Sequence, residues 1–305
     1  MAVSCLCFAS RLIHKVCLDA VFAHAQVSSV VVAGPALTPL PFLVNPSEYA
    51  EKFGVPVLDA QDETQQHMEQ LASQADVGIS LGYGKVLPSA VIAAPRLGVF
   101  NLHPSALPQY RGKHPDLLAI MDGQDTIGIT LHRMEKGVDT GPIVFQHREA
   151  VRAEDTIITL SDRLYRQGAL LLERLLANLA KGRVPEEVVQ PASVDALEAR
   201  RAIHWRDSAW RIHNLVRALT YPWPMARTSF EGKPVFISRT RIIKDGTIEP
   251  GLILEVSGSG IRVGTGGDSI EVLELRDERR EIVPLSEFAT RFQIVAGTSC
   301  FGDGA

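Results

Sequence analysis

Short, largely apolar runs alternate with amphipathic segments along the first half of the chain. Residues 2–8, 28–33 and 76–81 are apolar runs typical of buried strands, whereas residues 12–25 and 64–74 repeat apolar positions at helical spacing. This alternation predicts an α/β fold with an open, mostly parallel, Rossmann-like sheet and right-handed crossovers. Shorter elements complete the pattern: helices are expected at 48–53, 89–93 and 115–121, and strands at 55–59, 97–100 and 126–131.

The pattern changes in the second half of the chain. A long amphipathic helix is expected over 156–181, with Asp155 as its N-cap. Another helix is expected over 204–219. The short β-like runs that follow are punctuated by Gly and Asp, and they predict a smaller β-rich domain, an OB-like barrel or a meander. These runs lie at 226–230, 234–237, 251–256, 260–264 and 269–275.

The length and composition are those of an ordinary globular protein with more than one domain. The 305 residues are 46% hydrophobic and 22% charged, with a net charge of −4, which is weak evidence against a main role in gripping nucleic acid. Four cysteines, no apolar run of membrane-spanning length and no signal-peptide pattern indicate a cytoplasmic protein. We expect an α/β domain over 1–183, a linker over 184–203 and a C-terminal domain over 204–305.

Candidate chemistry is concentrated between Gly98 and Gly141. Asn101 and His103 follow an apolar strand, and Asp139 follows the next one, so all three are expected at the downstream ends of adjacent strands, where open α/β sheets bind ligands. An Asn amide can donate to an oxyanion, and a His–Asp pair can move a proton. The set therefore suits acyl transfer to an amine. A structural histidine and a turn aspartate remain the alternatives.

Two motifs in this stretch resemble those of one enzyme family. NLHPSALPQYRG resembles the N-x-H and S-L-L-P-x-x-R-G signature of the formyltetrahydrofolate-dependent formyltransferases, with Ala106 in place of the usual Leu. GITLHRMEKGVDTGPIVFQ resembles the second signature of that family, with its D-x-G turn at Asp139 and Gly141. HWRDSAWRIHNLVRALTYPWPMA is similar to the start of the family's C-terminal domain. The resemblance implies an enzyme that transfers a formyl group from N10-formyltetrahydrofolate to a primary amine.

The resemblance also implies roles for individual residues. Asn101 and protonated His103 would stabilise the oxyanion, and Asp139 would raise the basicity of the histidine and help to take the amine proton. Ser105, Arg111 and Lys113 would contact the acceptor or brace the loop. No metal is expected. The residues expected to bind the folate are Gly82, Tyr83, Gly84, Lys85, Val86, Leu87 and Asp155.

The family divides by its amine acceptor. Methionyl-tRNA enzymes carry a basic insertion after the second strand, but residues 33–49 contain no Lys or Arg, and FASRL replaces the G-T-P-x-F-A run of those enzymes. The region from Arg206 onward has 13 Lys and Arg against 13 Asp and Glu, so it is not a basic platform for tRNA. Gly112–Pro115 and Trp223–Pro224 resemble the sugar N-formyltransferases instead.

We therefore expect a small-molecule acceptor, most of all a nucleotide-linked amino sugar, with tRNA unlikely as a partner. Methionyl-tRNA formylation and a folate-binding hydrolase that transfers to water remain alternatives, and a homodimer is left open. Cations for a diphosphate and aromatic rings for a base are available, although each could brace a loop or fill the core. They are Arg111, Lys113, Arg133, Arg217, Trp205, Trp210 and Trp223.

Overall fold

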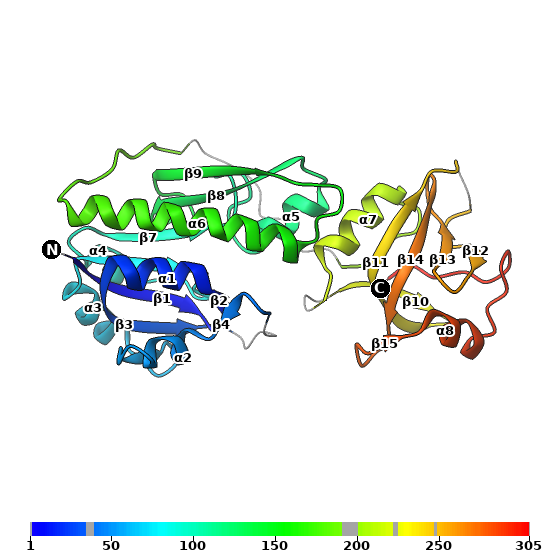
Figure 1. Ribbon diagram of the computed structural model, residues 1–305, viewed down its shortest axis with the longest axis horizontal. Helices are drawn as coiled ribbons and strands as arrows, with labels where there is room; N and C mark the ends of the chain where they lie inside the picture. The colour runs from blue at the N-terminus through cyan, green and yellow to red at the C-terminus, as the bar shows by residue number, and fades with distance from the viewer. Residues whose placement is uncertain (1, 35–39, 191–200, 222–224, 247–248, 305) are drawn as a thin grey trace. The chain divides into compact units, whose positions relative to one another are not determined.

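The computed structural model describes residues 2–34, 40–190, 201–221, 225–246 and 249–304, and its contacts divide the chain into two compact units (Figure 1). The first unit comprises residues 1–115, 126–150 and 161–197. The second comprises residues 116–125, 151–160 and 198–305. Each is described by itself.

The first unit is built on a seven-stranded sheet with the strand order β5-β3-β1-β6-β7-β8-β9. Its strands are β1 (Val3–Ser10), β3 (Ala25–Ala33), β5 (Val57–Asp59), β6 (Val77–Leu81), β7 (Val99–His103), β8 (Thr126–Arg133) and β9 (Ile143–Ala150). The chain winds outward from β1 to β3 and β5, and then returns to the other side of β1 with β6 and β7. The reversal places a topological switch point between β1 and β6, and ligands bind outside the carboxyl ends of strands at such points.

The sheet is parallel from β5 to β7, as expected, but β8 is antiparallel to both of its neighbours. The expected open, mostly parallel sheet is therefore confirmed, with β8 as an antiparallel strand near one edge. The connection between β8 and β9 is only residues 134–142, which is too short for the helical crossover that parallel strands require. Strand β9 itself was not recognised in the sequence.

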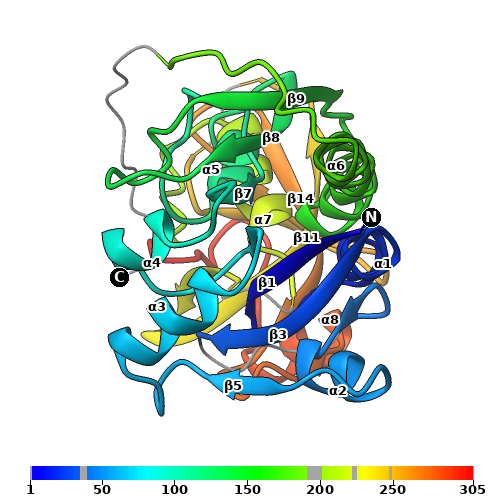
Figure 2. The same cartoon turned by 90° about the vertical axis from the view of Figure 1, so that its left-hand side faces the viewer.

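Helices cover both faces of this sheet. Helices α1 (Lys15–His24) and α6 (Ile157–Ala180) lie on one face, and α3 (Gln65–Ser73) and α4 (Ser89–Ala93) lie on the other (Figure 2). The apolar strand residues between them are almost fully buried, including Leu6, Phe8, Val31 and Val99. The remaining elements are α2 (Pro46–Glu51) and a small antiparallel pair, β2 (Ile13–His14) and β4 (Leu43–Val44).

The second unit is β-rich and antiparallel, which confirms the expected smaller C-terminal element of the fold. Its sheet has the order β10-β11-β14-β13-β12, and β15 pairs with β14. The strands are β10 (Ala226–Phe230), β11 (Lys233–Ile243), β12 (Ile253–Val256), β13 (Ile261–Gly264), β14 (Ser269–Arg276) and β15 (Ile282–Val283). The helices α5 (Pro115–Met121), α7 (Ala209–Ala218) and α8 (Leu285–Arg291) belong to it as well. Strand β15 and helix α8 were not expected.

No helix in the described part of the chain is long and apolar enough to cross a membrane. The expected division into 1–183, 184–203 and 204–305 stays a prediction, and residues 191–200 of the expected linker lie outside the described residues.

Candidate active site

Asn101 and His103 lie two residues apart on β7, so their side chains project from the same face of the sheet. In the sheet, Asn101 lies beside Ser80 of β6 on one side and His132 of β8 on the other. Asn101 and His103 were expected just after the strand, but they lie within β7. Asp139 was expected at the same edge of the sheet, after a neighbouring strand. Because β8 runs antiparallel to β7, the downstream ends of these two strands lie at opposite edges, and this expectation was wrong.

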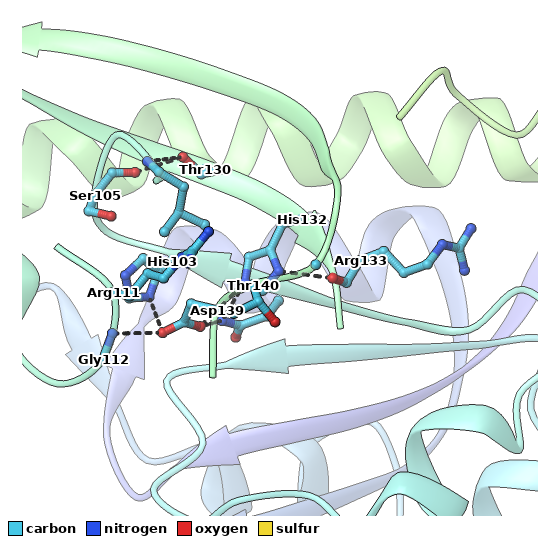
Figure 3. Close-up of polar contacts among 12 residues, drawn as sticks. His103, Ser105, Arg111, Gly112, Thr130, His132, Arg133, Asp139 and Thr140 are labelled. Atoms are coloured by element: carbon cyan, nitrogen blue, oxygen red, sulfur yellow. Dashed lines mark hydrogen bonds and ion pairs between the residues drawn. The ribbon is translucent and has the colours of Figure 1, made fainter. Parts of the chain in front are cut away.

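Asp139 reaches the site from the turn between β8 and β9. It adopts a positive φ of 51°. Its Oδ1 accepts a hydrogen bond from Asn101 Nδ2 at 3.3 Å, and its Oδ2 accepts one from the Gly112 N–H at 2.9 Å. Oδ2 also lies 3.5 Å from His103 Nδ1 (Figure 3). The structure therefore brings together the amide, imidazole and carboxylate that the sequence singled out.

The shape of this turn depends on Gly141. A Cβ atom at that position would lie 1.9 Å from the carbonyl oxygen of Arg133, a separation that real Cβ atoms do not show. The turn therefore folds close against its own strand, which carries Asp139 back over β7.

His103 is only 4% exposed, and its ring lies between two acceptors. Its Nε2 lies 2.9 Å from the carbonyl oxygen of Tyr110, to which it donates, and its Nδ1 faces the carboxylate of Asp139. Burial lowers the pKa of His103, while the Asp139 carboxylate and the Tyr110 carbonyl act in the opposite direction. The carboxylate is therefore placed to stabilise the imidazolium form.

Asp139 is held ionised at neutral pH. Burial would raise the pKa of its carboxyl, but the hydrogen bond from His132, the charge of His103 and the Gly112 N–H together lower that pKa to about 2. The site therefore contains a half-buried negative charge surrounded by four groups able to donate to it.

His132 is a member of this group that was not singled out in the sequence. It is 1% exposed, and its Nε2 lies 3.2 Å from Asn101 Nδ2 and 3.4 Å from Asp139 Oδ1. Its Nδ1 lies 2.9 Å from the carbonyl oxygen of Arg133. The available signal was a pair of polar residues, Thr130 and His132, at alternate positions of an apolar strand, but only the antiparallel register reveals that they face Asn101 and His103.

The loop after β7 is fixed by its own polar side chains. Ser105 is 1% exposed, and its hydroxyl donates to the carbonyl of Gln109 at 2.8 Å. The Thr130 hydroxyl donates to the Ser105 carbonyl at 2.7 Å and accepts from the Leu107 N–H (Figure 3). Lys113 is exposed. The loop is thus tied to β8 at Ser105 and Leu107, and the Lys113 side chain is open to solvent.

The segment expected to hold the folate continues from β6. Because Leu81 pairs with Leu102, Gly82 begins next to His103. Gly82, Gly84, Lys85 and Val86 are exposed, whereas Tyr83 and Leu87 pack into the core of the first unit. A Cβ at Gly84 would lie 3.0 Å from the Cα of Gly34. The segment therefore presents the backbone of Gly82 and Gly84 at the carboxyl end of β6, beside the exposed side chains of Lys85 and Val86.

Asp155 belongs to the second unit by its contacts. It is 3% exposed, and its carboxylate accepts from the Arg152 N–H at 2.8 Å and from the Thr159 hydroxyl at 3.0 Å. It is not the N-cap of α6 as expected. The helix begins at Ile157, and the residue before it, Thr156, accepts from the Thr159 N–H at 3.4 Å.

Two of the arginines considered for an anionic acceptor are engaged inside the protein. Arg133 Nε donates to Glu187 at 2.6 Å. Arg217 is buried, and its Nη1 donates to the carbonyl groups of Arg152 and Asp155 at 3.0 and 3.1 Å. Arg133 Nη1 also donates to the carbonyl of Leu97 at 2.6 Å, so both arginines brace the backbone.

The tryptophans differ in their surroundings. Trp205 is in the core of the second unit, and its indole N–H donates to the Thr228 hydroxyl at 2.9 Å. Trp210 is 48% exposed. Trp223 lies outside the described residues.

Comparison with known proteins identifies the family. Residues 41–176 match the formyl transferase family, and residues 198–293 match the formyl transferase C-terminal domain. The chain belongs to the formyl transferase family and is a formyltransferase, which confirms the family indicated by the two sequence motifs.

The similarity extends over nearly the whole chain. The chain is 35% identical over 280 residues to the methionyl-tRNA formyltransferase of Paracoccus denitrificans, and the alignment covers 88% of this chain and 91% of that protein. Its fold is similar to that of an N-formyltransferase from Helicobacter canadensis in complex with folinic acid and dTDP-3-aminofucose, with a TM-score of 0.68, 19% identity and coverage of 88% and 98% of the two chains. It is also similar to HypX from Aquifex aeolicus in complex with tetrahydrofolic acid, with a TM-score of 0.65, 17% identity and coverage of 95% of this chain and 48% of that one, so it spans about half of HypX.

Proposed function

We propose that this enzyme transfers a formyl group from N10-formyltetrahydrofolate to a primary amine, and that Asn101, His103 and Asp139 carry the reaction. The main support is the convergence of an amide donor, a buried imidazole and an ionised carboxylate, with Asp139 oxygens 3.3 Å from Asn101 Nδ2 and 3.5 Å from His103 Nδ1. A donor, a proton carrier and a fixed negative charge are what amine acylation requires.

The segment after β6 fits a pterin ring. Gly82 and Gly84 are exposed glycines at the carboxyl end of a central strand, and Gly82 has a φ of 63° that favours glycine. Backbone N–H and C=O groups can pair with the edge of a flat heterocycle, and the absence of a Cβ permits close approach. N10-formyltetrahydrofolate supplies the transferable formyl carbon when it is bound. We propose that the backbone of Gly82–Leu87 holds it.

The three residues have different roles in the transfer. As the amine nitrogen bonds to the formyl carbon, the carbonyl oxygen becomes negative, and Asn101 Nδ2 and protonated His103 are the donors that stabilise it. Asp139 attracts the proton that the amine loses. That proton ends on the folate nitrogen from which the carbon departs, so charge and atoms balance.

Both oxyanion donors change partner in this mechanism. Asn101 Nδ2 donates to Asp139 Oδ1 at 3.3 Å and lies 3.2 Å from His132 Nε2, so one of its hydrogens has to turn toward the developing oxyanion. His103 Nε2 donates to the carbonyl of Tyr110 and His103 Nδ1 faces Asp139, so one of these ring N–H groups also has to leave its partner.

For the acceptor, we propose a small-molecule amine, most of all a nucleotide-linked amino sugar. The supporting observation is the absence of Lys and Arg from residues 33–49, together with the balanced charge of the C-terminal region. Methionyl-tRNA is the second candidate, and the 35% identity to a methionyl-tRNA formyltransferase favours it. Transfer to water is the third.

One experiment distinguishes these acceptors. The purified enzyme is incubated with N10-formyltetrahydrofolate and either a panel of nucleotide-linked amino sugars, methionyl-tRNA or no acceptor, and products are measured by mass spectrometry. A formylated sugar supports the proposal. Formylated methionyl-tRNA alone selects the second acceptor, and tetrahydrofolate release without an amine selects hydrolysis. Absence of any formyl transfer contradicts the proposed function.

The matched controls for this experiment are His103→Asn and His147→Asn. His147 lies on β9 and contacts Glu149 on the surface of the unit. The first substitution should abolish transfer, and the second should leave it intact.

A further inference from the structure

The segment after α6 contains a side chain that contacts both loops of the site. Residues 184–190 were expected to begin a linker, but Val188 pairs with Ile143 through two backbone hydrogen bonds of 2.8 Å. This antiparallel bridge holds the segment against β9, the edge strand of the sheet. Gln190 follows two residues later.

The amide of Gln190 uses both of its ends. Its Nε2 donates to the carbonyl of Asp139 at 3.1 Å and to the carbonyl of Gly141 at 2.6 Å. Its Oε1 accepts from Arg111 Nη2 at 2.9 Å. One side chain therefore connects the turn that carries Asp139 with the loop that follows β7.

The contacted residues are neighbours of the groups that orient the site. Arg111 lies between Tyr110, whose carbonyl accepts from His103, and Gly112, whose N–H donates to Asp139 Oδ2. The two loops therefore meet twice, once at the carboxylate of Asp139 and once through Gln190. The connection through Gln190 fixes the distance between Asp139 and the loop after β7, whose Tyr110 carbonyl accepts from His103.

We propose that Gln190 is a positioning residue for formyl transfer. Its three hydrogen bonds hold the turn that carries Asp139 at a fixed distance from the loop after β7, whose Tyr110 carbonyl binds His103. The inference rests on the proposed function, in which Asp139 and His103 act together. An amide suits this position because two carbonyl oxygens need a donor and a guanidinium needs an acceptor. A carboxylate would keep the second contact but would be repelled by the two carbonyls.

The expected effect is on turnover. Displacement of a catalytic group by about 1 Å can cost on the order of 100-fold in rate. Gln190→Ala and Gln190→Glu should each lower kcat by about 10- to 100-fold while changing KM by less than about threefold, because Gln190 holds the reacting groups and does not bind substrate. Val189→Ala is the matched control, since the neighbouring Val189 is 81% exposed.

Two measurements test the proposal. The first is kcat and KM with N10-formyltetrahydrofolate and the acceptor that wild type formylates best. The second is hydrogen exchange by mass spectrometry in peptides covering residues 104–114 and 134–143, which does not depend on activity. Support consists of the lower kcat together with faster exchange confined to these two peptides.

Unchanged kcat in Gln190→Ala would overturn the proposal, as would faster exchange throughout the unit, because that result indicates general destabilisation only. If wild type formylates no acceptor, the proposed function fails. In that case the hydrogen-exchange measurement still tests the connection between the two loops. If the two peptides of Gln190→Ala exchange at the wild-type rate, the connection is refuted, and if they exchange faster than in wild type, it is supported.

Discussion

His132 has two ring nitrogens with different partners, so two substitutions can remove them separately. Asparagine places an amide nitrogen near the position of Nδ1 and can still donate to the carbonyl of Arg133. Glutamine reaches the position of Nε2 and can still contact Asn101 and Asp139. If His132 supports the site through Nε2, His132→Asn should be much more harmful to formyl transfer than His132→Gln.

The structure allows the size of this difference to be worked out. Nε2 lies 3.4 Å from an oxygen of the ionised, half-buried Asp139, and a hydrogen bond to a charged group contributes about 1.5–3 kcal/mol. Loss of that amount in the transition state corresponds to a rate lower by about 10- to 100-fold. The hydrogen bond from His132 also lowers the pKa of Asp139. Its loss should raise that pKa above about 2, so the acid limb of the pH–rate profile should move to higher pH.

The assay is the pH dependence of kcat/KM for wild type, the two variants and the His147→Asn control. We expect His132→Asn to be slow with a displaced acid limb, His132→Gln to lie within about fivefold of wild type, and His147→Asn to be unaffected. Equal rates for His132→Asn and wild type, at equal stability, would refute a role for this histidine.

Three further predictions concern stability. Because the folded pKa of Asp139 is about 2 against 3.8 in a free chain, its charge contributes about 2 kcal/mol that is present above pH 4 and lost as pH falls toward 2. Urea titrations of Asp139→Asn should show that deficit at pH 7 and a shrinking one in acid, and a constant deficit would contradict the linkage. Gly141→Ala should lower the free energy of unfolding by several kcal/mol, since its Cβ would lie 1.9 Å from the Arg133 carbonyl oxygen, and an unchanged melting temperature would contradict this. Burial lowers the pKa of His14 to about 4, so wild type should lose up to about 3 kcal/mol as pH falls from 6.5 to 4; His14→Phe should show a flatter profile, and an equal slope in both would exclude His14 as the cause.

Much of the fold followed from local patterns. The strands β1, β3 and β6 are continuous apolar runs because they are buried on both faces, and α6 has a long helical period. The directions of the strands could not be predicted from these patterns, because the antiparallel placement of β8 depends on how a short turn closes against a strand that is distant in sequence. The apolar content of a strand is the same in either direction.

The candidate site was also predicted from the sequence only in part. Asn101, His103 and Asp139 were predicted because two sequence motifs carry them, and their proximity is a property of the structure. His132 was missed because its partners lie 31 and 7 residues away and are defined only by strand register. Gln190 was placed in a linker because its segment has mixed charge and no period, although its contacts with Asp139 and Arg111 are 51 and 79 residues apart in sequence.

The central claim is tested most directly by single-turnover transfer from N10-formyltetrahydrofolate to the best acceptor of the panel, by wild type and by Asp139→Asn. The substitution keeps the size of the side chain and removes the charge between Asn101 and His103. We expect wild type to formylate the amine and the variant, folded by circular dichroism, to be slower by on the order of 1,000-fold. Transfer by Asp139→Asn at the wild-type rate would contradict the assignment of this site.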